Sequence, residues 1–98
     1  MSKIKILIVD DHQIVRDGIK LYLEKNPDFE IVAEADSGEE AVSLLKHIEV
    51  DLVMVDINMK GISGIETTQQ IMKDHPELRV LALTMHNDYQ HIKSMMDA

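Results

Sequence analysis

Four short apolar runs divide the chain, and each is rich in leucine, alanine or β-branched residues. They occupy residues 4–9, 31–35, 52–55 and 80–83. Runs of this length and composition predict β-strands. The first, third and fourth runs are nearly continuous in apolar character, which predicts strands covered on both faces. The second run alternates with acidic residues, which is typical of an edge strand.

The segments between the runs have apolar residues at the three- and four-residue spacing of amphipathic helices. The first segment stops at Asn26-Pro27, and its apolar positions are Ile14, Val15, Ile19, Tyr22 and Leu23.

Capping signals mark the helices that follow. Ser37 with Glu40, and Ser63 with Glu66, have the spacing of a capping box, so a helix is expected after each serine. The apolar pattern of the first of these extends to residue 48, and His75-Pro76 ends the second. Residues 87 and 88, Asn-Asp, predict the start of a fourth helix.

Strands and helices thus alternate along the chain, in the order strand then helix, four times. Such alternation predicts a parallel sheet with right-handed crossovers and helices on both faces. Ligands of open α/β sheets bind outside the carboxyl ends of the strands, so chemistry is expected there.

Polar side chains follow three of the predicted strands at that rim. Asp10 and Asp11 end the first strand, Asp56 ends the third and Thr84 ends the fourth. Packed carboxylates repel one another unless a cation offsets their charge, and Mg²⁺ prefers oxygen ligands. An ion that keeps several waters leaves room for phosphoryl oxygens, so the rim predicts a magnesium site for phosphate chemistry.

The composition of the chain limits which partners and which cell compartment are expected. A formal charge of -8 disfavours direct nucleic-acid binding by this chain. The first apolar run is too short for a membrane span or signal peptide and soon meets Asp10-Asp11. The absence of cysteine is compatible with a reducing compartment. We therefore expect a cytoplasmic protein without membrane attachment.

Three motifs together resemble bacterial receiver domains of response regulators. They are residues 6–12 (ILIVDDH), 51–56 (DLVMVD, with Met59 and Gly64 after it) and 81–84 (LALT). The Asp-Asp-His sequence with Val-Arg-Asp-Gly at 15–18 is most similar to receivers of the NarL/LuxR/FixJ type. The resemblance implies a flavodoxin-like α/β fold with the sheet order 2-1-3-4.

The resemblance also implies a role for each rim residue. Asp56 matches the phosphoacceptor, Asp11 a direct Mg²⁺ ligand and Asp10 an acid that holds the ion partly through water. Asn58 would contribute its backbone carbonyl to the metal, and Thr84 matches the switch hydroxyl. The phosphoryl donor would be a sensor histidine kinase, and the protein would be a signalling switch rather than an enzyme with external substrates.

The family also has a fifth strand that ends in a lysine, followed by a fifth helix, and neither matches any part of these 98 residues. We therefore expect residues 1–98 to be a receiver domain that is incomplete at its carboxyl end. Contact with DNA would come only from a helix-turn-helix domain beyond it. An uncovered fourth strand predicts self-association.

Two alternatives stay open at this stage. One is a truncated receiver that acts only as a dimerising interaction module. The other is a small Mg²⁺-dependent phosphatase that forms a phosphoaspartate. The phosphatases of this kind end their first strand in Asp-x-Asp, whereas Asp10 and Asp11 are adjacent, which disfavours the second alternative.

Overall fold

A computed structural model describes residues 3–56 and 64–83. Its strands are β1 (Ile4–Val9), β2 (Phe29–Ala35), β3 (Leu52–Asp56) and β4 (Arg79–Leu83). Its helices are α1 (Gln13–Leu23), α2 (Gly38–Leu44) and α3 (Gly64–Asp74). The four predicted strands and the first three predicted helices are confirmed. The helix expected after Asn87-Asp88 lies outside the described residues.

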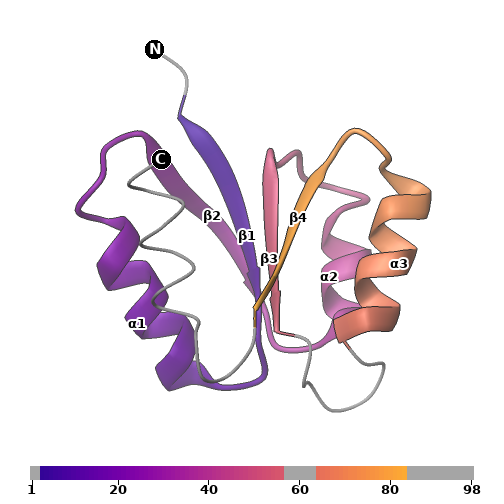
Figure 1. The fold of residues 1–98 in the computed structure, drawn as a ribbon, viewed down its shortest axis with the longest axis horizontal. Coiled ribbons are helices and arrows are strands. Elements are labelled where there is room, and N and C mark those ends of the chain that lie inside the picture. Colours follow the sequence, from indigo (N-terminus) through magenta and orange to yellow (C-terminus); the bar gives the residue numbers. More distant parts are fainter. Residues whose placement is uncertain (1–2, 57–63, 84–98) are drawn as a thin grey trace.

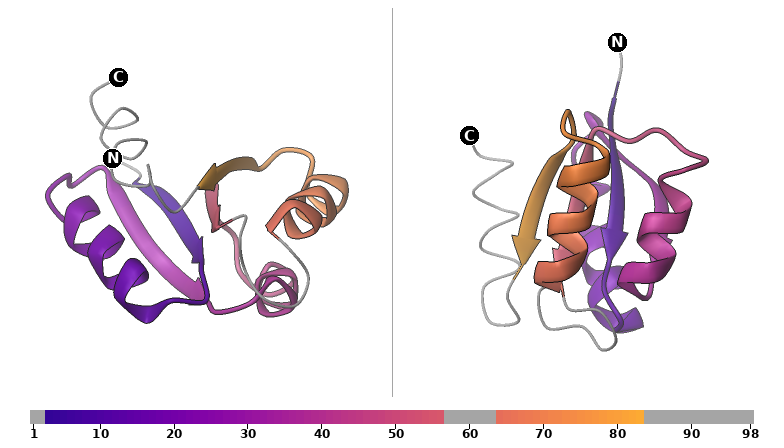
Figure 2. Two further views of the ribbon diagram at one scale, coloured as in Figure 1. Left: turned by 60° about the horizontal axis from the view of Figure 1, so that its bottom comes forward. Right: turned by 90° about the vertical axis from the view of Figure 1, so that its right-hand side faces the viewer.

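The four strands form one parallel sheet in the order β2-β1-β3-β4, as the resemblance implied. Helix α1 covers one face, and α2 and α3 cover the other (Figure 1). Figure 2 shows the same layers from two further directions, with the twist of the sheet. The predicted flavodoxin-like α/β architecture is therefore confirmed.

Each face of the sheet has its own apolar core, because successive side chains of a strand point to opposite faces. The core under α1 contains Ile6, Ile8, Ile19, Leu23, Leu52 and Met54. The core under α2 and α3 contains Leu7, Val9, Ala35, Ala41, Leu45, Val50, Val53, Val55 and Ile71. All of β3 is buried, and it therefore anchors both cores at the centre of the molecule.

Strand β4 differs from the expectation that it is covered on both faces. It forms the second edge of the described sheet, and it pairs there with β3 alone. Val80 and Leu81 are only partly buried and Ala82 is exposed. For the described part of the chain, that expectation is wrong, because apolar character alone does not reveal whether a neighbouring layer is present.

Helix α1 corrects the predicted inward face at one position. Ile14 is 84% exposed, although it was counted among the apolar positions of the helix. It lies about 140° around the helix from buried Ile19, whereas Arg16 lies only about 60° from it. Arg16 is accordingly 9% exposed and occupies a core-facing position.

Helix α2 begins as the capping box predicts, because the Ser37 hydroxyl accepts a hydrogen bond from the Glu40 amide at 3.1 Å. The Glu40 carboxylate reaches back to the Asp36 amide at 2.9 Å. The helix ends at Leu44, earlier than the pattern indicated, and hydrogen-bonded turns continue to Ile48.

A β-bulge in β2 reverses the face toward which its side chains point. Ile6 pairs with Ile31, but the next residue of β1, Leu7, pairs with Ala33, so Val32 is the extra residue. Phe29 and Ile31 consequently pack on the α1 side, and Ala33 and Ala35 on the other. Simple alternation would have placed Ile31, Ala33 and Ala35 on one face. The bulge instead puts the side chain of Glu34, opposite Ile8, on the α1 face.

Candidate functional site

The candidate site lies at the carboxyl ends of β1 and β3, which are neighbours in the sheet. Val9 pairs with Val55, so the residues that follow them are adjacent in space. Asp10, Asp11, His12 and Asp56 each place one potential ligand atom within 4.8 Å of the others. The predicted gathering of Asp10, Asp11 and Asp56 at one rim is therefore confirmed.

Asp10 is buried at the base of this cluster, with 2% of its surface exposed. Its Oδ1 accepts a hydrogen bond from the His12 amide at 2.8 Å. Burial raises the pKa of the Asp10 carboxyl, and the charge of Asp56 raises it further, while the hydrogen bonds from His12 oppose the shift. The folded chain therefore resists charging Asp10 unless something positive lies beside it.

Asp56 is also 2% exposed, whereas Asp11 is partly exposed and His12 is largely exposed. The Nδ1 of His12 lies 2.8 Å from Asp11 Oδ1 and 3.2 Å from Asp10 Oδ1. The imidazole thus stands at the mouth of the cluster, against both acids of β1. His12 was assigned no role from the sequence, and these contacts were not predicted.

The donor set fits a hard divalent cation. Three carboxylates from two strands converge, two of them buried, and the pKa of Asp10 is raised partly by the charge of Asp56. Oxygen ligands with a net negative charge are those that Mg²⁺ takes in phosphoryl-transfer sites. Asp10, Asp11 and Asp56 are therefore the described carboxylates that could hold Mg²⁺.

Two predicted site residues lie outside the described part of the chain. They are Asn58, whose backbone carbonyl was expected to bind the metal, and Thr84, which was expected to be the switch hydroxyl. Their roles stay predictions.

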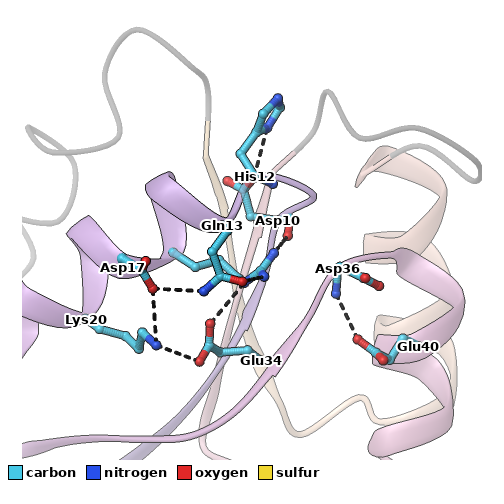
Figure 3. A network of polar contacts seen from close by, with 9 residues as sticks. Asp10, His12, Gln13, Asp17, Lys20, Glu34, Asp36 and Glu40 are labelled. Atoms are coloured by element: carbon cyan, nitrogen blue, oxygen red, sulfur yellow. Dashed lines mark hydrogen bonds and ion pairs between the residues drawn. The ribbon is translucent and has the colours of Figure 1, made fainter.

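A network of polar side chains supports the cluster from the α1 side (Figure 3). Arg16 donates to Glu34 Oε1 at 2.9 Å, to Gln13 Oε1 at 2.7 Å and to the backbone carbonyl of Asp10. Lys20 pairs with Glu34 at 2.8 Å and with Asp17 at 3.4 Å. Sequence reasoning missed this network, because its members are polar residues spread over α1 and β2 with no local motif.

Lys20 and Arg16 both lower the pKa of Glu34. The hydrogen bond from Lys20 is the largest cause that lowers the pKa of Glu34, and Arg16 adds to it. Glu34 also raises the pKa of Lys20. The carboxylate between α1 and β2 is therefore held in its charged form.

Comparisons with known proteins agree with this geometry. A family model described as the response regulator receiver domain matches residues 6–98. The chain is 38% identical over 95 residues to the transcriptional regulatory protein DegU of Brevibacillus brevis. It is 41% identical over 95 residues to the response regulator protein VraR of Staphylococcus aureus (strain Mu3 / ATCC 700698).

These matches cover 97% of this chain but only 40% of DegU and 46% of VraR, so the chain spans less than half the length of either relative. Among solved structures, a LuxR-family two-component response regulator from Aurantimonas sp. SI85-9A1 superposes with a TM-score of 0.81. It is 34% identical, and the match covers 99% of this chain and 71% of that one.

In the described residues, no helix is long and apolar enough to cross a membrane.

Proposed function

Because the chain belongs to the response regulator receiver domain family, we propose that residues 1–98 work as a phosphoacceptor receiver domain with Asp56 as the acceptor. The observation that carries the proposal is the convergence of Asp10, Asp11 and Asp56 at the carboxyl ends of two adjacent strands. A nucleophilic carboxylate and two further acids for Mg²⁺ are what phosphoryl transfer to aspartate requires.

In the proposed reaction, a carboxylate oxygen of Asp56 attacks phosphorus and forms a new O–P bond. The bond from phosphorus to the donor histidine nitrogen breaks, and that nitrogen keeps the electron pair and takes up a proton. Asp10, Asp11, Asp56 and the Asn58 carbonyl would hold Mg²⁺, which supplies charge neutralisation at the phosphoryl oxygens. Thr84 would turn its hydroxyl toward the new phosphoryl group and so report the modification.

The donor in this proposal is a sensor histidine kinase in the cytoplasm. The relatives named above are a transcriptional regulatory protein and a response regulator. We further propose that this receiver acts in the control of transcription, and that contact with DNA is made by a separate DNA-binding domain. The net charge of -8 supports a division of labour in which the receiver itself does not touch DNA.

The proposed acceptor can be tested with phosphoramidate, a small donor that has the same phosphorus–nitrogen bond as phosphohistidine. With Mg²⁺ present, the intact mass should rise by one phosphoryl group. Asp56→Asn should abolish the rise, because it removes the nucleophile but keeps the volume. Asp51→Asn is a matched control at the opposite end of β3, where Asp51 accepts a hydrogen bond from the Lys5 amide at 2.8 Å. Labelling that persists in Asp56→Asn would refute the assignment.

The edge strand β4 supports a second part of the proposal, which is self-association. Val80 and Leu81 are partly exposed and Ala82 is exposed along the edge of the described sheet, and apolar edges favour pairing with another chain. Light scattering after size-exclusion chromatography should show a dimer that Ala82→Lys weakens. Val32→Lys on the other edge, where Val32 is 38% exposed, is the control. A monomer at all concentrations would exclude this part without affecting the acceptor role.

A further inference from the structure

Arg16 is the one described residue whose side chain links α1, β2 and the backbone of the acidic cluster through the hydrogen bonds identified above. It is 9% exposed, and its three donor nitrogens contact three different groups. Nε reaches Glu34, Nη2 reaches Gln13 and Nη1 reaches the carbonyl oxygen of Asp10. A guanidinium is suited to bridging three groups because its donors are held in a rigid plane.

The carbonyl that Arg16 contacts belongs to the peptide bond between Asp10 and Asp11. Because a peptide unit is planar, the direction of this carbonyl fixes the orientation of the whole unit. Both acids project from the ends of that unit, so a rotation of it would turn both carboxylates. A hydrogen bond to the carbonyl therefore acts on two proposed metal ligands at once.

The other polar groups of Asp10 are held as well. Its amide donates to the carbonyl of Ala35 at 3.0 Å, and its carboxylate accepts from the His12 amide at 2.8 Å. The first contact ties Asp10 to β2 and the second ties it to the start of α1. The His12 imidazole also lies 3.2 Å from the same carboxylate. Arg16 adds the contact to the carbonyl oxygen of Asp10, which neither of these backbone bonds nor His12 reaches.

Glu34 fixes the direction of Arg16, and it can do so only because of the bulge at Val32. The bulge puts Glu34 on the α1 face, opposite Ile8, where its carboxylate meets Arg16 and Lys20. Without the extra residue, strict alternation would place Glu34 on the face covered by α2 and α3. The irregularity in β2 is thus coupled to the position of Asp10 and Asp11, which follow β1.

From these contacts we propose that Arg16, oriented by Glu34, is a positioning residue that sets the geometry of Asp10 and Asp11 for binding a divalent cation. The inference rests on the proposed function, because it assigns a role to Arg16 at the same site. Groups that orient metal ligands from outside the coordination sphere commonly alter metal affinity by about 10- to 100-fold when they are replaced.

The test compares Mg²⁺ dissociation constants measured from the backbone amide shifts of Asp11 and His12. Arg16→Gln should weaken Mg²⁺ binding by about 10-fold, because it loses the charged fork that spans Glu34 and Asp10. Arg16→Lys should restore little of this affinity, since one ammonium group cannot reproduce the planar set of donors. Lys20→Gln is the matched control, because Lys20 binds the same Glu34 but, among the described residues, contacts Glu34 and Asp17 and not Asp10.

Urea denaturation of each variant separates positioning from stability. If Arg16 has only a structural role, Arg16→Gln should lower the urea midpoint but leave the Mg²⁺ dissociation constant equal to that of Lys20→Gln. That result would overturn the inference. If Arg16→Gln fails to fold, Glu34→Gln replaces it, because it leaves Arg16 in place and removes the carboxylate that orients it. A folded Glu34→Gln with wild-type Mg²⁺ affinity would equally overturn the inference.

The same titration distinguishes this inference from the proposed function. Wild-type protein whose amide shifts at Asp10, Asp11 and Asp56 do not respond to Mg²⁺ would contradict the metal site itself, and the role of Arg16 with it. A normal wild-type response with an unchanged Arg16→Gln response would contradict the role of Arg16 alone.

Discussion

The two faces of the sheet are built differently, although both are packed against helices. The face under α2 and α3 is an apolar core in which the only buried polar side chain is Thr67, among the described residues. The face under α1 combines an apolar core with the network of Arg16 and Glu34, which extends to the backbone of Asp10. The difference indicates that one face mainly stabilises the fold, whereas the other also orients the acidic site.

The largest expected effect tests whether the α2/α3 face is purely structural. Ile71 of α3 is 1% exposed within that core. Ile71→Ala should lower the free energy of unfolding by about 2–5 kcal/mol, because it removes buried methyl groups and leaves a cavity. Urea denaturation measures the loss. In the folded fraction, Mg²⁺ affinity should be unchanged, and a parallel loss of affinity would break the comparison between the faces.

The next effect concerns the α1 face and has a defined pH dependence. Glu34→Gln should lower the free energy of unfolding at neutral pH by about 1–3 kcal/mol, because it breaks hydrogen bonds between charged groups. The pKa of Glu34 is lowered in the folded protein from its ordinary value of 4.5. Its contribution is therefore present above pH 4.5 and is lost as the pH falls through the folded pKa.

Urea denaturation of both proteins from pH 7 to acid measures this dependence. The difference between wild type and Glu34→Gln should be largest at neutral pH and should shrink below pH 4.5. A difference that is constant across the whole range would mean that the charge of Glu34 contributes nothing.

A third prediction concerns the acidic cluster at the carboxyl ends of β1 and β3. Burial and the charge of Asp56 raise the pKa of Asp10, so its ionised form opposes folding at neutral pH. Asp10→Asn should therefore raise the free energy of unfolding in the absence of Mg²⁺, by less than the losses above, since Asn keeps an oxygen for the His12 amide. Thermal denaturation with and without Mg²⁺ checks this.

Added Mg²⁺ should make the wild type more stable than Asp10→Asn, which reverses their order without the ion. Binding to the folded state alone stabilises the wild type in proportion to the occupancy of its site. Asp10→Asn has lost one proposed ligand and should gain less from the ion. If Mg²⁺ stabilises both proteins equally, Asp10 is not part of the metal site.

The sequence predicted the architecture and the gathering of acids because both depend on local patterns. Alternating strands and helices imply a parallel sheet, and residues at the ends of neighbouring strands must then converge. Asp10, Asp11 and Asp56 were found in this way. Thr84 was placed at the rim by the same logic, whereas the role of Asn58 was implied only by the family resemblance. Both stay predictions, since both residues lie outside the described part of the chain.

The support of the site could not be predicted in the same way. The bulge at Val32 arises from the pairing of β2 with β1, and no glycine or turn residue marks it in the sequence. Without the bulge, the alternating pattern assigns Glu34 to the wrong face. Arg16 was likewise hidden, because a charged residue in a helix is usually solvated, and its partner Glu34 lies 18 positions away.

The smallest expected effect concerns Thr67, the only buried polar side chain among the described residues of the α2/α3 face. The hydroxyl of Thr67 is fully buried and has no hydrogen-bond partner in the described structure, unlike neighbouring Thr68, which donates to the Gly64 carbonyl at 2.8 Å. A buried hydroxyl without a partner costs free energy, and a methyl group of similar size does not. Thr67→Val should therefore raise the free energy of unfolding by up to about 1 kcal/mol. Thr68→Val, which removes a satisfied hydroxyl from the same helix, should lower it. Urea denaturation of the pair gives the sign of each change, and a destabilised Thr67→Val would mean that this hydroxyl has a partner, so that both faces of the sheet carry polar structure.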